Sequence, residues 1–249
     1  PTGSGKTTTV FSVLSELNTP DRNITTMEDP VEYELEGVNQ AEIDTHRNVT
    51  WEPLLKGFLR QDPDAGLIGE IRDRATAETA IRQALTGHVV FATLHTISCA
   101  QTVERLIDMG VNADMLASAL TLVASQRLVR CLCPQCRVRA SADVRDRELF
   151  ESHGFKAPAE LWHPRAAGCP ECRQGYKGRR AAVEILPIAE DVARLIEGRA
   201  RARDFAEWAR GNGFPTVYEV ALGMAAEGIT SMAEACEWQS VWEDFSWKE

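Results

Sequence analysis

The residues with the most specific chemistry in this 249-residue chain are the first seven, Pro1 to Thr7. They match the phosphate-binding pattern G-x-x-x-x-G-K-[ST] from its second position, so the first glycine of the pattern would precede Pro1. Lys6 would contact the β- and γ-phosphates of a nucleoside triphosphate, and the Thr7 hydroxyl would hold Mg²⁺. Gly3 and Gly5 would let backbone N–H groups approach the phosphate oxygens. The residues that we expect to bind nucleotide are Thr2, Gly3, Ser4, Gly5, Lys6, Thr7 and Thr8.

A helix is predicted to follow this loop, because the apolar residues Val10, Val13, Leu14 and Leu17 have helical spacing. Its N-terminal dipole would face the bound anion. The alternative, a Gly-Ser turn beside a run of threonines, is disfavoured because the motif and the helix agree. The incomplete pattern leads us to expect that the chain belongs to a longer protein and binds ATP poorly until its upstream part is restored.

Acidic residues follow an apolar segment at 24–27. If this segment is a parallel strand, Glu28 lies at its carboxyl end, where ligands bind in such sheets. Glu28 would then polarise the water that attacks the γ-phosphate, and Asp29 would orient that water. A solvated acidic turn at Asp29-Pro30 explains the segment equally well when it is taken alone.

Glu70 follows a second apolar segment, Leu67-Ile68, and would support Mg²⁺ there, often through water. This signal is weaker than the phosphate loop. Gly69 stands where an aspartate is more usual, and Ala65-Gly66 are small where bulky strand residues are expected.

Two histidines, His88 and His95, bracket the apolar segment 89–94, which is predicted to be a buried strand. His95 should emerge at the carboxyl end of that strand, near the phosphates. A lone histidine is more often a packed or surface residue. A pair beside a phosphate-binding loop favours a γ-phosphate sensor or a switch at a subunit interface.

Strand-like and helix-like segments alternate through the first half of the chain. This alternation, with near-continuous apolar strands, indicates an α/β fold with a mostly parallel sheet covered by helices. Helices are predicted at 51–59 (capped by Thr50), 75–85, 99–109 and 114–128. A short strand is expected at 183–186, and further helices through 193–196, 205–209, 217–226 and 232–235.

Two C-x-x-C pairs, Cys133 with Cys136 and Cys169 with Cys172, are separated by 32 residues. Together they would present four thiolates in a tetrahedral site, which suits Zn²⁺. Such a site is structural, since four protein ligands leave no position open for water. The intervening segment 137–168 is expected to have little core of its own, so the metal would supply much of its folding free energy. Four buried cysteines or a redox pair are the less favoured alternatives.

The remaining cysteines carry weaker signals. Cys131 would compete for the metal or oxidise. The simpler explanation is that this cysteine is a neutral substitution at a surface or half-buried position. Cys99 and Cys236 are interpreted as small hydrophobic residues. Seven cysteines with four in pairs indicate a reducing compartment.

The composition narrows the classes of function further. The chain has 27 basic and 37 acidic residues, a net charge of −10, which argues against a broad nucleic-acid-binding surface. A hydrophobic content of 44% is ample for a packed core, and no apolar run reaches the length of a membrane-spanning helix. The tail 237–249 holds three of the six tryptophans. Within it, Trp238, Val241, Trp242 and Phe245 have the spacing of a helical apolar stripe that would pack on its own protein or dock a partner.

Several segments occur together in one order: PTGSGKTTT, MEDPVEYELEGVNQ, RQDPD with GEIRD, TGHVVFATLHT, and QRLVRCLCPQC. This combination resembles the family of type II secretion and type IV pilus assembly ATPases, from Pro1 to about Ala235. In that family the segments are called Walker A, Asp box, Walker B and His box. The resemblance implies a RecA-like P-loop core, a small tetracysteine zinc module and a C-terminal helical subdomain.

The resemblance also implies roles for single residues. Glu28 matches the catalytic glutamate of the Asp box and Glu70 the Walker B carboxylate, while Arg60 and Arg179 match positions that act near the phosphates or across subunit contacts. The residues with implied catalytic or coupling roles are Glu28, Glu70, Arg60, His88, His95 and Arg179. Asp29 and Arg72 match as well, with less definite roles.

By the same resemblance the protein is a homo-hexameric cytoplasmic motor that hydrolyses ATP with Mg²⁺ at subunit borders. It would act through an inner-membrane platform protein, be peripheral to that membrane through partners only, and bind no nucleic acid. Relatives carry a preceding domain that supplies arginines to the nucleotide. The motifs do not separate secretion from pilus extension. The alternatives are a RecA-like nucleic-acid motor and an inactive truncated scaffold of the same family.

We expect four parts along the chain. They are a RecA-like core at 1–130, a tetracysteine metal module at 131–180, a helical subdomain at 181–236 and the Trp-rich tail at 237–249.

Overall fold

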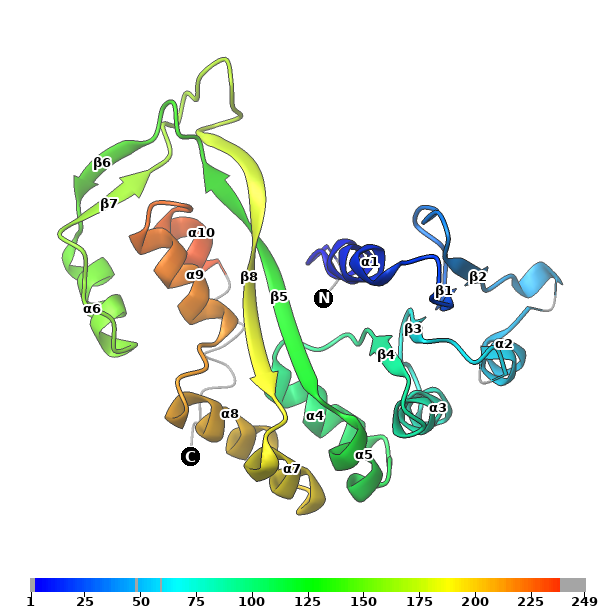
Figure 1. Ribbon diagram of the computed structural model, residues 1–249. Coiled ribbons are helices and arrows are strands. Elements are labelled where there is room, and N and C mark those ends of the chain that lie inside the picture. The colour runs from blue at the N-terminus through cyan, green and yellow to red at the C-terminus, as the bar shows by residue number, and fades with distance from the viewer. Residues whose placement is uncertain (1–2, 48, 59, 238–249) are drawn as a thin grey trace. The chain divides into compact units, whose positions relative to one another are not determined.

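The computed structural model describes residues 3–47, 49–58 and 60–237 (Figure 1). The chain divides into two compact units, and it leaves the first unit and later returns to it. The first unit comprises residues 1–124 and 186–212, and the second comprises 125–185 and 213–249. The four-part division expected from the sequence stays a prediction, and the Trp-rich stripe of the tail lies outside the described residues.

A four-stranded parallel sheet forms the centre of the first unit, as the sequence predicts. Its strands lie in the order β2-β1-β3-β4, and each neighbouring pair is parallel. The central strands β1 and β3 are buried along their whole length, whereas β4 at one edge is only partly buried. The strands are β1 (Ile24–Glu28), β2 (Asn39–Glu42), β3 (Ala65–Ile68) and β4 (Val89–Ala92).

Successive residues of β3 belong to different cores, because side chains alternate across a strand. Leu67 packs with Phe11 and Leu14 of the first helix, whereas Ile68 packs in a larger core with helices from elsewhere in the unit. Helices therefore cover both faces of the sheet. The helical segments are α1 (Lys6–Leu17), the 3-10 turn η1 (Thr45–Arg47), α2 (Trp51–Phe58), α3 (Arg74–Leu85), α4 (Cys99–Asp108), α5 (Ala113–Ala119), α7 (Glu190–Glu197) and α8 (Ala202–Gly211).

Three of these helices begin at a side-chain cap, which explains why they start where they do. Asp73 accepts a hydrogen bond from the Thr76 N–H at the start of α3, and Ser98 accepts one at the start of α4. Asn112 does the same for α5. Each side chain satisfies one of the N–H groups that a helix leaves unpaired in its first turn.

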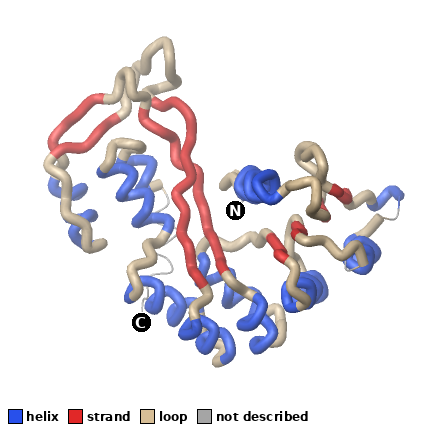
Figure 2. The backbone as a smooth tube through the Cα atoms, in the orientation of Figure 1, coloured by secondary structure: helices blue, strands red, loops and turns tan. Residues whose placement is uncertain are grey.

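The prediction of a helix at 114–128 is wrong over the second half of that range. Helix α5 ends at Ala119, and β5 (Leu122–Leu132) follows. Within β5 every second residue from Val123 to Val129 is buried, which is the period of a strand. Its partner is β8 (Tyr176–Pro187), about 50 residues further on, so the residues near β5 in the sequence do not indicate that it pairs as a strand. Figure 2 shows these two long strands in red.

The second unit has more structure between its cysteine pairs than the sequence predicts. The segment 137–168 forms the antiparallel strands β6 (Val138–Ser141) and β7 (Glu160–His163), with α6 (Val144–Ser152) between them. Phe150 and Leu161 are almost fully buried in a core with α9 (Val217–Ala226) and α10 (Met232–Cys236). Phe150 and Leu161 share their core with helices that lie far along the sequence, so the expectation that the segment has little core of its own stays a prediction.

Within the described ranges, no helix is both long enough and apolar enough to span a bilayer.

Candidate functional site

The loop before α1 has the backbone of a phosphate-binding turn. Gly3 has φ +75° and Gly5 has φ +86°, values in the left-handed region that favours glycine. Gly5 is the N-cap residue of α1 and has no side chain, so the positive end of the helix dipole faces the loop uncapped. Ser4 between the two glycines is buried. Thr2 lies outside the described residues.

Lys6 and Thr7 place this loop at the carboxyl edge of the sheet. The Lys6 ammonium donates to the carbonyl of Leu94, 3.2 Å away and two residues beyond the end of β4. The Thr7 hydroxyl donates to Glu32 Oε1 at 3.0 Å, in the segment that follows β1. Both groups are therefore near the ends of strands that carry the predicted catalytic residues.

Glu28 is the last residue of β1, and only 4% of its surface is exposed. Its Oε1 accepts hydrogen bonds from Thr26 Oγ1 at 2.6 Å and from Gln40 Nε2 at 3.1 Å. Both donors are uncharged, so they orient the carboxylate without forming an ion pair. A solvated acidic turn describes the exposed Asp29 but not Glu28.

Glu70 lies directly after β3 and connects three segments of this edge. Its Oε2 accepts from Arg72 Nε at 2.5 Å, and its Oε1 lies 3.3 Å from His95 Nε2. Arg72 Nη1 also reaches Asp29 Oδ2 at 3.2 Å. Hydrogen bonding to Glu70 raises the pKa of Arg72 above its ordinary value. The residues after β1, β3 and β4 are thus joined by one guanidinium and one imidazole.

Steric constraints require glycine at two positions of the Walker B segment, which the sequence did not reveal. A Cβ on Gly69 would lie 2.9 Å from the Met27 carbonyl oxygen and 3.2 Å from the Glu28 Cα, so no side chain fits at this position. A Cβ on Gly66 would lie 2.2 Å from the Phe58 ring. The small residues of β3 therefore leave room for a neighbouring strand and for an aromatic ring, and they do not loosen the strand.

The other candidates lie away from this edge. His88 directly precedes β4, and Arg60 lies between α2 and β3, so both are at the amino edge of the parallel sheet. Arg60 is exposed, and its Nε donates to the Lys56 carbonyl at 3.1 Å. Arg179 is exposed on β8 of the second unit. The structure therefore separates His88 from His95, although both belong to one motif.

Sequence reasoning missed several residues that contact the candidates. Thr26 was predictable, since a residue two positions before Glu28 lies on the same face of a strand. Gln40 was not, because it belongs to β2, a polar edge strand without an apolar pattern. Glu32, which contacts Thr7, and Asp62, which contacts His88, give no signal beyond their charge.

The four paired cysteines of the second unit form one cluster. Their Sγ atoms all lie within 4.8 Å of one another. Three of the Sγ–Sγ distances are 3.7 Å (Cys133–Cys169), 3.6 Å (Cys136–Cys172) and 3.6 Å (Cys169–Cys172). Four thiolates around a metal at about 2.3 Å would be about 3.8 Å apart, whereas a disulfide needs about 2.05 Å. The donors and their spacing fit tetrahedral metal coordination.

The turns around the cluster bring the two pairs together. The Cys133 N–H donates to the Gly175 carbonyl at 2.8 Å. Burial and hydrogen bonds with the other thiols raise the pKa of Cys136 to about 12. At Cys172, burial is outweighed by hydrogen bonds from Cys169, and the pKa is lowered to about 7. A metal must displace such protons, so its affinity rises with pH. The cluster does not include Cys131, whose pKa is raised by burial.

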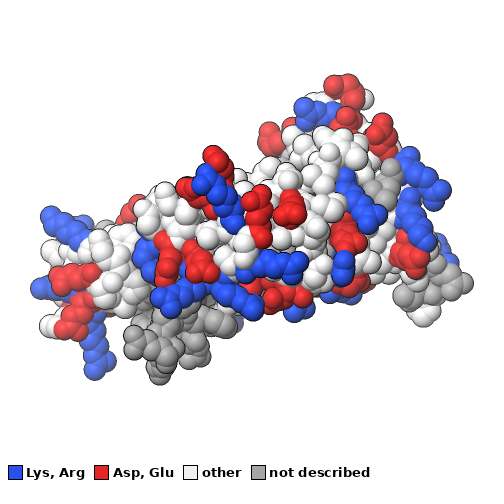
Figure 3. Space-filling view, turned by 90° about the horizontal axis from the view of Figure 1, so that it is seen from below, with Lys and Arg blue, Asp and Glu red and all other residues white. Residues whose placement is uncertain are grey.

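Charges of both signs share the surface. Figure 3 shows Lys and Arg side chains next to Asp and Glu side chains over the face in view.

These features define a class of protein. A glycine turn before a helix, a parallel sheet and carboxylates beyond its strands make a RecA-like P-loop fold, the fold of many nucleoside triphosphatases. Comparison with known families agrees. The model of the family described as "Type II/IV secretion system protein" matches residues 1–237. The chain belongs to this family.

Three curated relatives illustrate the similarity. The chain is 44% identical over 234 residues to the Protein transport protein HofB homolog of Escherichia coli K12, covering 94% of this chain and 50% of that protein. It is 41% identical to the Type II secretion system ATPase E of Vibrio cholerae, covering 94% and 46%. It is 44% identical to the Type IV pilus assembly ATPase PilB of Thermus thermophilus, covering 94% and 26%. The chain thus spans half or less of the length of these relatives.

A solved structure supports the fold. The crystal structure of the pilus retraction motor PilT with bound ADP matches with a TM-score of 0.68 and 27% identity, over 95% of this chain and 58% of that one. Relatives named for secretion and relatives named for pilus assembly match about equally well, so the question left open by the motifs stays open.

Proposed function

We propose that the protein carrying this chain is an ATP-hydrolysing motor of a type II secretion or type IV pilus assembly machine. One observation carries the proposal: Lys6, Glu28, Glu70 and His95 come from four segments and gather at the carboxyl edge of one parallel sheet. This edge is where such sheets bind ligands. The family, with its members named as ATPases, supports the same function.

We assign the roles from the motifs and from the positions of these residues at the edge. Lys6 and the N-terminus of α1 bind the phosphates, and Thr7 and Glu70 would hold Mg²⁺, which would neutralise charge on the phosphate oxygens. Glu28 orients the attacking water and accepts its proton. Since Thr26 and Gln40 both bind Oε1, we assign the water contact to Oε2. His95 senses whether a γ-phosphate is bound, through its contact with Glu70.

The assembly is proposed from the resemblance. Six copies form a ring with nucleotide at their borders, and Arg60 and Arg179 connect neighbouring sites, for which their exposed positions are suitable. The motor works in the cytoplasm and reaches the inner membrane only through partners such as a platform protein. The four cysteines hold a structural Zn²⁺, because they fill a tetrahedral site completely.

The test measures ATP hydrolysis by the full-length protein that carries this chain. Lys6→Ala should lower kcat/KM by about 10²-fold or more, because a preorganised charge on the phosphates is lost. Lys56→Ala is the matched control, since Lys56 is exposed and pairs only with Glu52 among the ion pairs of the described residues. Equal ATP hydrolysis by Lys6→Ala and wild type would contradict the motor proposal. Hydrolysis that appears only with added DNA would favour the nucleic-acid motor, and a full-length protein without hydrolysis would favour the scaffold.

A further inference from the structure

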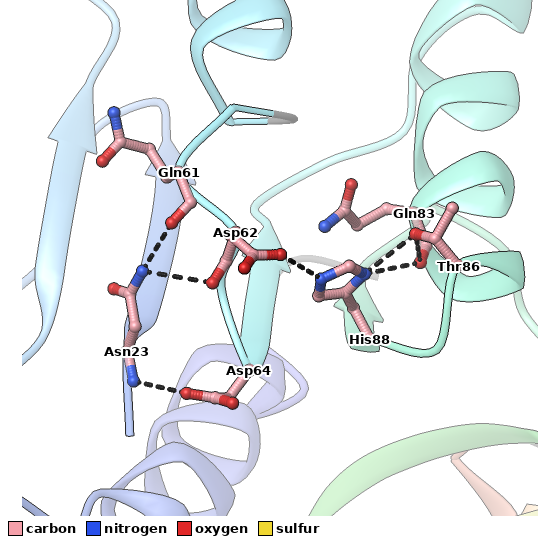
Figure 4. Close-up of polar contacts among 7 residues, drawn as sticks. All are labelled: Asn23, Gln61, Asp62, Asp64, Gln83, Thr86 and His88. Carbon is pink, nitrogen blue, oxygen red and sulfur yellow. Dashed lines mark hydrogen bonds and ion pairs between the residues drawn. The ribbon is translucent and has the colours of Figure 1, made fainter. Parts of the chain in front are cut away.

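His88 is held by acceptors on both sides of its ring. Nδ1 lies 2.9 Å from Thr86 Oγ1 and 3.2 Å from the Gln83 carbonyl oxygen, and Nε2 lies 3.1 Å from Asp62 Oδ1 (Figure 4). The imidazole is mostly covered, with 19% of the side chain exposed, whereas 94% of the Asp62 side chain is exposed. Packing therefore fixes the ring, and the ring fixes Asp62.

The Asp62 carboxylate fixes the role of one ring nitrogen. A carboxylate only accepts hydrogen bonds, so Nε2 carries a proton and donates it to Oδ1. The Thr86 hydroxyl lies 2.8 Å from the Gln83 carbonyl oxygen and 2.9 Å from Nδ1, so polar groups at the end of α3 hold the other side of the ring.

His88 lies against the C-terminal end of α3. Gln83 lies in the last turn of α3, which ends at Leu85, and its carbonyl is at the negative end of the helix dipole. The groups that α3 and its cap direct at the ring, Gln83 and Thr86, are uncharged. The charged group that faces the ring is Asp62, because the carboxylate of the nearby Asp64 accepts from the Asn23 N–H at 2.7 Å.

The loop 60–64 is tied down on its other side as well. Asn23 Nδ2 donates to the Gln61 carbonyl at 2.7 Å and to the Asp62 carbonyl at 3.4 Å (Figure 4). Asp62 has φ +46°, a left-handed value that is costly for a residue with a Cβ and needs external support. Asn23 supports the backbone of this loop, and His88 supports its side chain.

We propose that His88 is a positioning residue, a clasp that holds Asp62 and thereby fixes the loop 60–64 with Arg60 at the amino edge of the sheet. The clasp is the hydrogen bond from Nε2 to Asp62, and the contacts of Nδ1 at the end of α3 hold the ring in place to make it. Only the last step, from Arg60 to coupling between active sites, rests on the proposed function.

The first arm of the test needs no nucleotide. Hydrogen exchange of segment 60–64 is measured in the full chain at one pH. His88→Gln and Asp62→Asn should each lower protection about tenfold below wild type, as expected for the loss of one charge-assisted hydrogen bond. The double variant should lose nothing more. Asp64→Asn is the matched control: it removes a charge two residues away but keeps an oxygen for Asn23, and it should retain wild-type protection.

Protection of the loop within twofold of wild type in both single variants would overturn the clasp, as would an equal loss of protection in Asp64→Asn. If the variants do not fold, nitrogen NMR of the wild type decides. A slowly exchanging N–H proton on Nε2 of His88 supports the clasp, and a ring with a bare Nε2 refutes it.

The second arm measures hydrolysis by the full-length protein. His88→Gln should lower kcat about tenfold with little change in KM, and should add nothing to Arg60→Ala, because both changes act through one loop. Loss of loop protection with unchanged hydrolysis would keep the clasp and refute the role of Arg60. Independent, additive losses of kcat would show that His88 acts on catalysis by another route and would overturn the positioning role.

Discussion

The nucleotide edge of the first unit and the cysteine cluster of the second unit are built in opposite ways. At the edge, the polar groups lie at or beyond the ends of the strands. The strands themselves are held in the core by apolar residues such as Met27 and Ile68. In the second unit the cysteines are part of the turns themselves, and the Cys133 N–H is bonded to the backbone of Gly175. The first site rests on a fold that exists without it, whereas the second site is part of the fold.

This difference means that the two sites should fail differently. Changes in the nucleotide edge should remove activity while the unit stays folded. Changes in the cysteine cluster should unfold the unit that contains it, because metal binding and folding are then one process.

The largest effect is expected from Cys133→Ser or from a strong chelator. Structural zinc sites contribute on the order of 10 kcal/mol in small domains, so the second unit should unfold while the first keeps its sheet. Metal analysis should find one zinc per wild-type chain. Hydrogen exchange should lose protection in 125–185 and 213–237 but not in 24–124.

Cys131→Ser is the control for this experiment, because its thiol is two residues from Cys133 and outside the cluster. It should retain zinc and protection. A metal-free Cys133→Ser protein with native exchange in both units would refute the structural role of the site.

A middle-sized effect is expected from Gly69→Ala. The new Cβ would displace the end of β1 and with it Glu28, because its nearest neighbours are backbone atoms that cannot rotate away. We expect the unfolding free energy to fall by about 1–3 kcal/mol, and kcat to fall about 10²-fold through misplacement of the catalytic group. Urea unfolding and ATP hydrolysis of the full-length protein measure the two effects.

Gly57→Ala provides the contrast, since a Cβ there would meet nothing within 4 Å. Gly57 lies in the last turn of α2, where alanine is still a better helix former than glycine, so the change should stabilise the protein by less than about 1 kcal/mol. If Gly69→Ala hydrolyses ATP as fast as wild type, the steric argument for this edge is wrong.

The smallest change in stability is expected from Arg72→Gln. Its ion pairs with Glu70 and Asp29 are solvent-screened, since 55% of the Arg72 side chain is exposed, so stability should change by less than about 1 kcal/mol. Activity should still fall about tenfold, because Glu70 loses the group that orients it. Arg74→Gln, which breaks the exposed pair with Glu78, should leave both unchanged. Parallel losses of stability and activity in Arg72→Gln would erase the contrast between the two sites.

The parts of the molecule that the sequence predicted are those with local chemistry. The phosphate loop and the cysteine pairs place their groups within a few residues, so the motif already contains the geometry. The position of β1 is local in the same way. The opposite placement of His88 and His95 was also predictable, because one precedes a strand and the other follows it.

The rest depended on pairings between distant segments. Strand β5 looked helical up to residue 128, because its partner β8 lies too far along the chain to affect a local pattern. The polar strand β2 gave no apolar signal, and so Gln40 was missed at Glu28. The core around Phe150 was missed because α9, which covers it, comes more than 60 residues later.

The ring of Phe58 occupies the space that a side chain on Gly66 would need. Neither position is free to vary alone. A larger residue on the strand requires a smaller one on the helix, and a smaller ring leaves a void that only a larger strand residue fills. We therefore expect a tolerated substitution at one of these positions to require a compensating substitution at the other.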